Sequence, residues 1–165
     1  MQTTNNPNIE EIRHRVHTSY NELNQLLAGP LANIDPARLY HSPAPGEWTI
    51  MENLAHILEF LPYWGNQITK LIAHPGQPFG RTQQDEQRLQ AIAAHASDTL
   101  LQIRTALPTS YQHLDTILSQ LQDSDLNLTG HHPTQGNRTL GWFINEFVAK
   151  HLADHVLQLK QTISA

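Results

Sequence analysis

Apolar residues recur at intervals of three and four along several stretches of the chain, the spacing of amphipathic α-helices. The first stretch covers residues 9–27 and ends where Gly29 and Pro30 interrupt the pattern. Asn6 and Pro7 have the identities of a helix N-cap followed by a proline in the first turn. We therefore expect the first helix to begin directly after Asn6.

The second stretch covers residues 50–71 and follows a proline-rich loop, residues 31–47, which is expected to contain at most a short turn. Thr49 and Glu52 stand three residues apart, as in a capping box, and this spacing predicts the start of the helix. Pro62 lies within the stretch. A proline inside a helix removes one backbone hydrogen bond, so a kink is expected there.

Helical periodicity returns at about residue 83 and is interrupted by Pro108. The pattern does not decide whether residues 83–122 form one bent helix or two. A last helix is predicted from the cap Thr139 to about Thr162, with loops at residues 74–82 and 123–138. No convincing alternation of apolar and polar residues appears, so the fold class is all-α, and four main apolar-faced helices predict a four-helix bundle.

Length and composition narrow the class of protein. The 165 residues suit a single domain over residues 1–165, with residues 1–6 as a flexible polar tail. The net charge of −5, without any cluster of Lys and Arg, disfavours nucleic-acid binding. No apolar run is long enough to span a membrane and no signal peptide is recognised, so a soluble cytoplasmic protein is expected. Cysteine is absent, which excludes disulfides and thiolate metal ligands.

Histidine is the unusual component, because eleven histidines exceed the ten lysines and arginines. His151 and His155 stand four residues apart, on one face of the last helix, within its apolar stripe. His56 lies at the edge of the apolar stripe of the second helix, whereas other helical histidines lie away from theirs. A divalent ion accepts imidazole nitrogen, so these three residues can form a metal site. Alternatively, they are core-edge histidines that bind no metal.

The segments Gly46–His56 and Gly136–Leu140, the latter followed by His151 and His155, together resemble the DinB-like superfamily. The likeness extends over roughly residues 10–162. It implies a four-helix bundle with up-down-down-up connectivity and a divalent metal ion, zinc or nickel, held by His56, His151 and His155. Because dimers are common in that family, it also implies a possible homodimer.

The resemblance also suggests an activity. Relatives include thiol transferases that use bacillithiol or mycothiol, and a mycothiol-dependent maleylpyruvate isomerase. By likeness, this chain is expected to be a metal-dependent thiol S-transferase that acts on a small electrophile, with a low-molecular-weight thiol as co-substrate. Two alternatives stay open: a metal-containing bundle with a structural or stress-response role, and a metal-dependent hydrolase. An open coordination position facing a pocket would favour an enzyme. The catalytic and thiol-binding residues stay unassigned.

Several polar residues have both a functional and an ordinary interpretation. Glu52 lies one turn before His56 and can orient that ring or bind the metal, but the capping box already explains it. Arg81 and Arg138 in the loops can bind a carboxylate of a thiol cofactor, although loop arginines are usually solvated. His131 and His132 precede the last helix, where a general acid or base is conceivable.

Overall fold

The computed structural model describes residues 7–165. The predicted tail and the predicted cap Asn6 lie outside these residues. Helix α1 (Ile9–Ala28) begins after Asn8, so the expected start directly after Asn6 is wrong. The Asn8 side chain accepts a hydrogen bond from the backbone amide of Glu11 at 2.8 Å, and the Glu11 carboxylate accepts one from the amide of Asn8 at 3.2 Å. This reciprocal capping box satisfies two free amides, which explains why the helix begins there.

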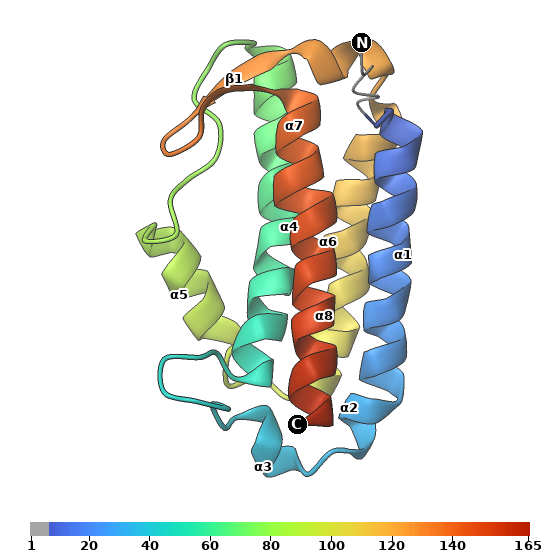
Figure 1. Cartoon of the computed structure of the whole chain (residues 1–165), viewed down its shortest axis with the longest axis vertical. Coiled ribbons are helices and arrows are strands. Elements are labelled where there is room, and N and C mark those ends of the chain that lie inside the picture. Colours follow the sequence, from blue (N-terminus) through green and yellow to red (C-terminus); the bar gives the residue numbers. More distant parts are fainter. Residues whose placement is uncertain (1–6) are drawn as a thin grey trace, which may run out of the picture.

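Four long helical rods form a bundle, which confirms the predicted all-α class. The rods are α1, α4 (Ile50–Ala73), α6 (Leu100–Gln120) and a composite of α7 (Leu140–Ile144), π-helix η2 (Asn145–Lys150) and α8 (His151–Ser164). Figure 1 shows α1 and the last rod running downward while α4 and α6 run upward, as in an up-down-down-up bundle. Their buried faces consist mainly of Leu, Ile, Val and Phe side chains.

The expected start of α4 is confirmed. Thr49 accepts the amide of Glu52 at 3.0 Å, and the Glu52 carboxylate accepts the amide of Thr49 at 2.7 Å. The helix then continues through Pro62 to Ala73. The loop before α4 holds two short helices, α2 (Pro30–Asn33) and α3 (Pro36–Leu39), where at most one turn was expected.

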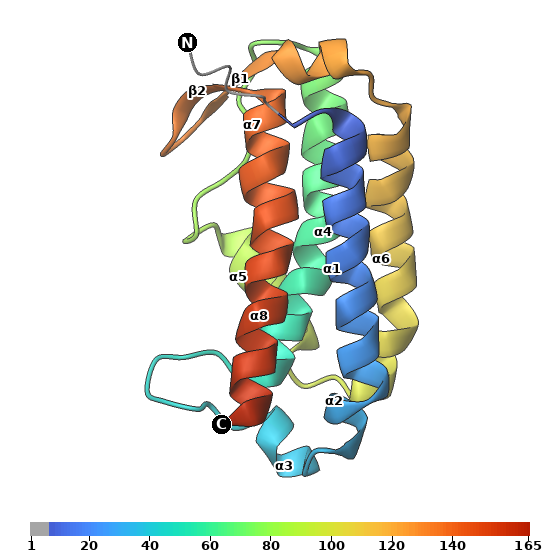
Figure 2. The same cartoon turned by 45° about the vertical axis from the view of Figure 1, so that its right-hand side comes forward.

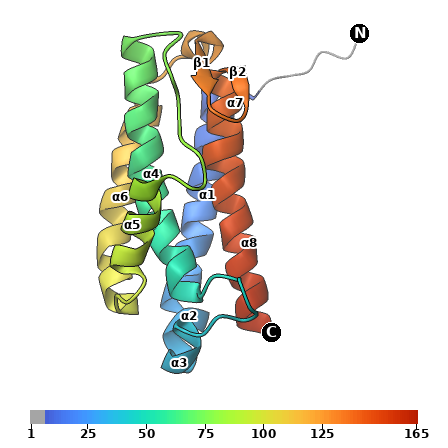
Figure 3. The same cartoon turned by 90° about the vertical axis from the view of Figure 1, so that its left-hand side faces the viewer.

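Residues 83–122 contain two helices, but the boundary does not lie at Pro108. Helix α5 (Glu86–His95) ends before residues 96–99, and a capping box between Thr99 and Gln102 starts α6. Pro108 is exposed inside α6, where a carbonyl released by the proline can face water. Figure 3 shows α5 outside the bundle, alongside α4, so of the two alternatives that the periodicity left open, the structure has two separate helices.

The predicted loop at residues 123–138 contains a short helix, η1 (Asp123–Asn127), and an antiparallel hairpin of β1 (Thr129–His132) and β2 (Gly136–Thr139). Four residues per strand are too few for a recognisable alternation. Figure 2 shows this hairpin at the start of α7, at the opposite end of the bundle from α3. The Phe79 amide donates to the His131 carbonyl at 2.9 Å, so the segment after α4 pairs with β1.

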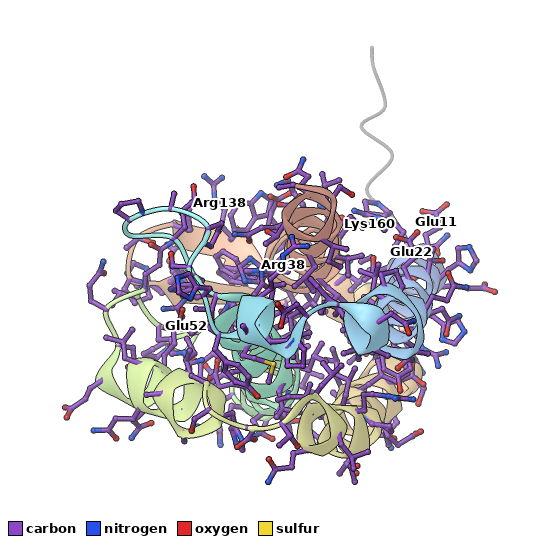
Figure 4. All side chains as sticks on the ribbon, turned by 90° about the horizontal axis from the view of Figure 1, so that it is seen from below. Glu11, Glu22, Arg38, Glu52, Arg138 and Lys160 are labelled. Atoms are coloured by element: carbon purple, nitrogen blue, oxygen red, sulfur yellow. The ribbon has the colours of Figure 1, made fainter. Side chains whose placement is uncertain are left out.

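Contacts at the lower end tie the last rod to the rest of the chain. Arg38 donates to the carbonyls of Thr162 and Ala165, each at 3.1 Å, and Lys160 pairs with Glu22 of α1 at 2.7 Å (Figure 4). Because these pairs are exposed, each contributes little to stability, and the apolar core holds the bundle together. Within residues 7–165, none of the helices combines the length and hydropathy needed to cross a membrane.

Candidate metal centre

Three histidine rings converge between α4 and α8. The Nε2 atom of His151 lies 2.9 Å from Nε2 of His56 and 3.1 Å from Nε2 of His155. One ligand nitrogen from each of the three residues lies within 4.8 Å of the others. Nitrogens bound to one tetrahedral zinc ion are separated by roughly 3.4 Å, so small ring rotations would accommodate an ion.

The hydrogen bonding of His56 fits an ion better than a metal-free cluster. Without an ion, the Nε2 atom of His151 can accept protons from the other two rings. The Nδ1 atoms of His56 and His155 are then acceptors, and both are buried without a hydrogen-bond partner among the described residues. A buried acceptor without a partner is costly. An ion that takes all three Nε2 lone pairs moves the proton of each ring to Nδ1, and the Nδ1–H of His56 then faces Oε2 of Glu59, a buried acceptor 3.7 Å away that also lacks a partner.

Burial keeps the three rings neutral, as a metal ligand requires. Burial, together with repulsion from a protonated His56 and from Arg88, lowers the pKa of His151 to about 4. Burial, followed by repulsion between protonated rings of the cluster, lowers the pKa of His155 to about 2. Burial also lowers the pKa of His56, although Glu59 offsets part of this effect.

These shifts predict that the metal-free protein loses stability in mild acid. The folded-state pKa values lie below the ordinary value of 6.5, so the unfolded chain binds more protons as the pH falls below 6.5. The free energy of unfolding should therefore decrease from pH 6.5 toward pH 4. Urea unfolding in the presence of a chelator at several pH values measures this slope. A His151→Gln, His155→Gln double variant should lose much of it; an unchanged slope would refute the explanation.

Glu59 lies next to His56 on α4, and its side chain is 8% exposed. Oε1 pairs with the Arg81 guanidinium, while Oε2 lies 3.7 Å from Nδ1 of His56 and has no hydrogen-bond partner among the described residues. Burial raises the pKa of the Glu59 carboxyl, but interactions with His56 and Arg81 outweigh burial and lower it overall. The charged carboxylate therefore faces the ring nitrogen that carries a proton when Nε2 binds a metal.

A pocket of about 390 Å³ opens from the histidine cluster toward α5 and the hairpin. His56 and His151 lie at its inner end, next to the aromatic rings of Phe60, Trp64 and Phe147. The outer wall is polar and is formed by residues from α5, the segment before it and the turn of the hairpin: Arg81, Thr82, Gln83, Gln84, Arg88, His132, Thr134 and Gln135. The cluster thus combines an apolar inner wall with a polar entrance.

Of the other charged residues for which the sequence allowed a functional role, Glu52, Arg81 and Arg138, only Arg81 lines the pocket. The Glu52 carboxylate caps α4 and is not part of the histidine cluster. Arg81 lines the pocket, with its guanidinium 3.6 Å above the Tyr63 ring, but it pairs with Glu59. Arg138 lies above the Trp142 ring, with 5.0 Å to the centroid, and is not among the residues that line the pocket.

The two histidines of the hairpin have different environments. His131 is exposed, and its Nδ1 atom lies 2.8 Å from the side-chain oxygen of Asn137. His132 is buried and lines the pocket. Its Nδ1 atom accepts the amides of Thr134 and Gln135 at 3.2 and 3.3 Å, which leaves the ring proton on Nε2. Burial lowers the pKa of His132, so the ring is neutral near pH 7.

Sequence reasoning missed two charged residues, Glu59 and Arg88. Glu59 stands three residues after His56, one helical turn away, and this spacing alone could have identified it as a partner of that ring. Arg88 reaches the pocket from α5. The periodicity of the sequence did not decide whether α5 is a helix of its own or the first part of a longer helix. No local pattern indicates that α5 folds back onto α4.

Solved structures with this fold include three with an informative description. YfiT from Bacillus subtilis, described as a probable metal-dependent hydrolase with an unusual four-helix bundle topology, has a TM-score of 0.71 at 14% identity and covers 94% of this chain and 89% of its own. A mycothiol-dependent maleylpyruvate isomerase has a TM-score of 0.72 at 14% identity, over 96% of this chain but 63% of its own. The colibactin self-resistance protein ClbS, solved with double-stranded DNA, has a TM-score of 0.64 at 14% identity, with 94% of both chains covered.

At such identities these likenesses show the fold alone. No curated protein matches the sequence. The family model of the DinB superfamily matches residues 15–159, a range that includes all three histidines of the cluster. The four-helix arrangement and the sequence match agree, and the chain belongs to the DinB superfamily.

Proposed function

We propose that the protein is a metal-dependent enzyme that binds a divalent ion through His56, His151 and His155 and transfers a small thiol to a small electrophile. The observation that carries the proposal is the cluster of three Nε2 atoms, two of whose residues, His56 and His151, line an open pocket. Among the described residues, no fourth His, Cys, Asp or Glu joins the cluster. A site with three protein ligands and access to a pocket is typical of catalytic zinc, whereas structural zinc sites are closed by four.

The bound ion would act as a Lewis acid that lowers the pKa of a thiol or a water molecule in the pocket. Three neutral imidazoles contribute no charge, so they leave the positive charge of the ion uncompensated. The Glu59 carboxylate would accept a hydrogen bond from Nδ1–H of His56 and so fix the orientation of that ring. Phe60 packs against the rings of His56 and His151, with centroids 5.1 and 4.9 Å away, and limits the access of water from that side.

The similar fold of the mycothiol-dependent isomerase supports a thiol as the co-substrate. Because the chain contains no cysteine, the sulfur in such a reaction would come from this second molecule. The likeness to YfiT, described as a probable hydrolase, favours hydrolysis as a second candidate, in which water takes the place of the thiol.

The test uses protein purified without a histidine tag. Elemental analysis is expected to find about one divalent ion per chain, as a three-ligand site predicts. The protein is then mixed with bacillithiol, mycothiol or cysteine and an electrophile such as monochlorobimane, and with an ester and an amide substrate in separate reactions. Metal-dependent thiol transfer that a chelator abolishes and added metal restores would support the proposal. A fully loaded protein that hydrolyses ester but transfers no thiol would favour the second candidate, and the absence of metal would refute both.

A further inference from the structure

The two arginines of the pocket differ in their partners. The Arg81 guanidinium pairs with Glu59 and lies 3.8 Å from Asp85, so two carboxylates compensate its charge. No ion pair is found for Arg88 among residues 7–165. Its Nη1 atom donates to the Gln83 carbonyl at 2.8 Å, and Asp85 accepts the backbone amide of Arg88 rather than its guanidinium. Arg88 therefore brings to the pocket a guanidinium that no carboxylate pairs with directly.

This charge lies near the histidine cluster. The Arg88 guanidinium stands above the Trp48 ring, 5.4 Å from its centroid. The same ring meets His56 edge-on at a centroid distance of 5.1 Å and stacks on His155 at 6.2 Å. The charge of Arg88 lowers the pKa of each of the three histidines, after the larger effect of burial. The guanidinium and the metal ligands thus face the same space.

We propose that Arg88 binds a carboxylate of the thiol co-substrate while the sulfur of the same molecule reaches the three histidines. This inference rests on the proposed function and narrows its substrate class to thiols that carry a carboxylate. A divalent ion and Arg88 together would place three positive charges at the pocket, whose other charged lining residue, Arg81, already pairs with Glu59 and Asp85. A thiolate that carries one carboxylate brings two negative charges, whereas a neutral thiol leaves Arg88 unpaired.

The shape and contacts of the pocket agree with a carboxylate. A guanidinium presents parallel N–H groups that match the two oxygens of a carboxylate. Gln83, Gln84, Thr134 and Gln135 line the same entrance with neutral amide and hydroxyl groups that can bind further polar atoms of the co-substrate. A phosphate carries up to two charges and would face only one arginine without an ion pair among these residues, so a carboxylate is the better match.

The test measures thiol binding by the cobalt-loaded protein, through the sulfur-to-cobalt absorption that appears when a thiolate binds. The probes are 3-mercaptopropionate and 3-mercaptopropionamide, which differ in charge but hardly in size, and the same pair with one more methylene. We expect at least one acid to bind about tenfold more tightly than its amide, as a charge-assisted hydrogen bond predicts. In Arg88→Gln this preference should disappear while the affinity for the amide stays the same.

Arg138→Gln is the matched control, because it removes an arginine outside the pocket and should keep the preference for the acid. Arg88→Lys should keep part of it, since the charge remains but the paired N–H groups are lost. Equal binding of acid and amide by the unaltered protein, or an unchanged preference in Arg88→Gln, would overturn the inference and leave the proposed function intact. If neither thiol produces the absorption although cobalt is bound, the proposed thiol chemistry itself fails.

Discussion

Replacing His151 by alanine is expected to abolish metal binding. The Nε2 atom of His151 is the central one of the three, 2.9 Å from that of His56 and 3.1 Å from that of His155. Loss of a ligand should cost more than the 10–100-fold typical of a lost outer contact, so we expect the affinity to fall by more than about 100-fold. Elemental analysis after dialysis, and a titration against a chelating dye, measure the stoichiometry and the affinity.

Histidines on the surface make a control necessary, because the chain has eleven histidines in all. His131→Ala removes an exposed histidine that lies outside the cluster, and it should retain one ion per chain. Thermal unfolding with and without chelator then separates two roles of the ion: a structural ion makes the unaltered protein much less stable when it is removed, and a catalytic ion has little effect. Full metal content in His151→Ala would exclude the three-histidine site.

Replacing Glu59 by glutamine should weaken metal binding by about 10–100-fold, the usual effect of removing a partner of a metal-bound histidine. The variant keeps the shape of the side chain but loses the charge that faces Nδ1 of His56 across 3.7 Å. It also leaves Arg81, whose side chain is only 12% exposed, without its closest counter-charge, so some loss of stability is expected. Competition with a chelating dye gives the affinity, and thermal unfolding of the metal-free variant gives the stability separately.

Glu52→Gln is the matched control for this substitution. Glu52 lies on the same helix, one turn before His56, whereas Glu59 lies one turn after it. The Glu52 carboxylate accepts a hydrogen bond from the backbone amide of Thr49 and so caps the helix. Its replacement should lower stability by a fraction of a kcal/mol to about 1 kcal/mol without changing metal affinity. If Glu52→Gln weakened metal binding and Glu59→Gln did not, the assignment of the positioning carboxylate would be reversed.

The parts of the fold that depend on local sequence could be predicted. Thr49 and Glu52 form the expected capping box, because both partners lie within one helical turn. His151 and His155 come together for the same reason, since four residues place them on one face of α8. The position of His56 opposite them depends on the packing of α4 against α8, which its place at the edge of the apolar stripe indicated.

The parts that depend on distant contacts could not be predicted. Pro108 was a stronger sequence signal for a helix end than residues 96–99, yet its exposed position lets α6 continue through it. Phe79 pairs with β1 across about fifty residues of sequence, a contact that no short pattern reveals. Arg88 is part of the pocket only because α5 folds back beside α4 (Figure 3).

The π-helix η2 sets the orientation of the two histidines relative to the start of the last rod. It holds six residues in a wider turn than an α-helix and joins α7 directly to α8. The wider turn winds six residues through about the rotation of five α-helical ones, so the same residues wound as a regular α-helix would rotate everything after them by about 100° relative to α7. His151 and His155 would then turn away from His56 although every side chain of the cluster was still present. The site therefore depends on the backbone winding of this segment as well as on the three histidine side chains.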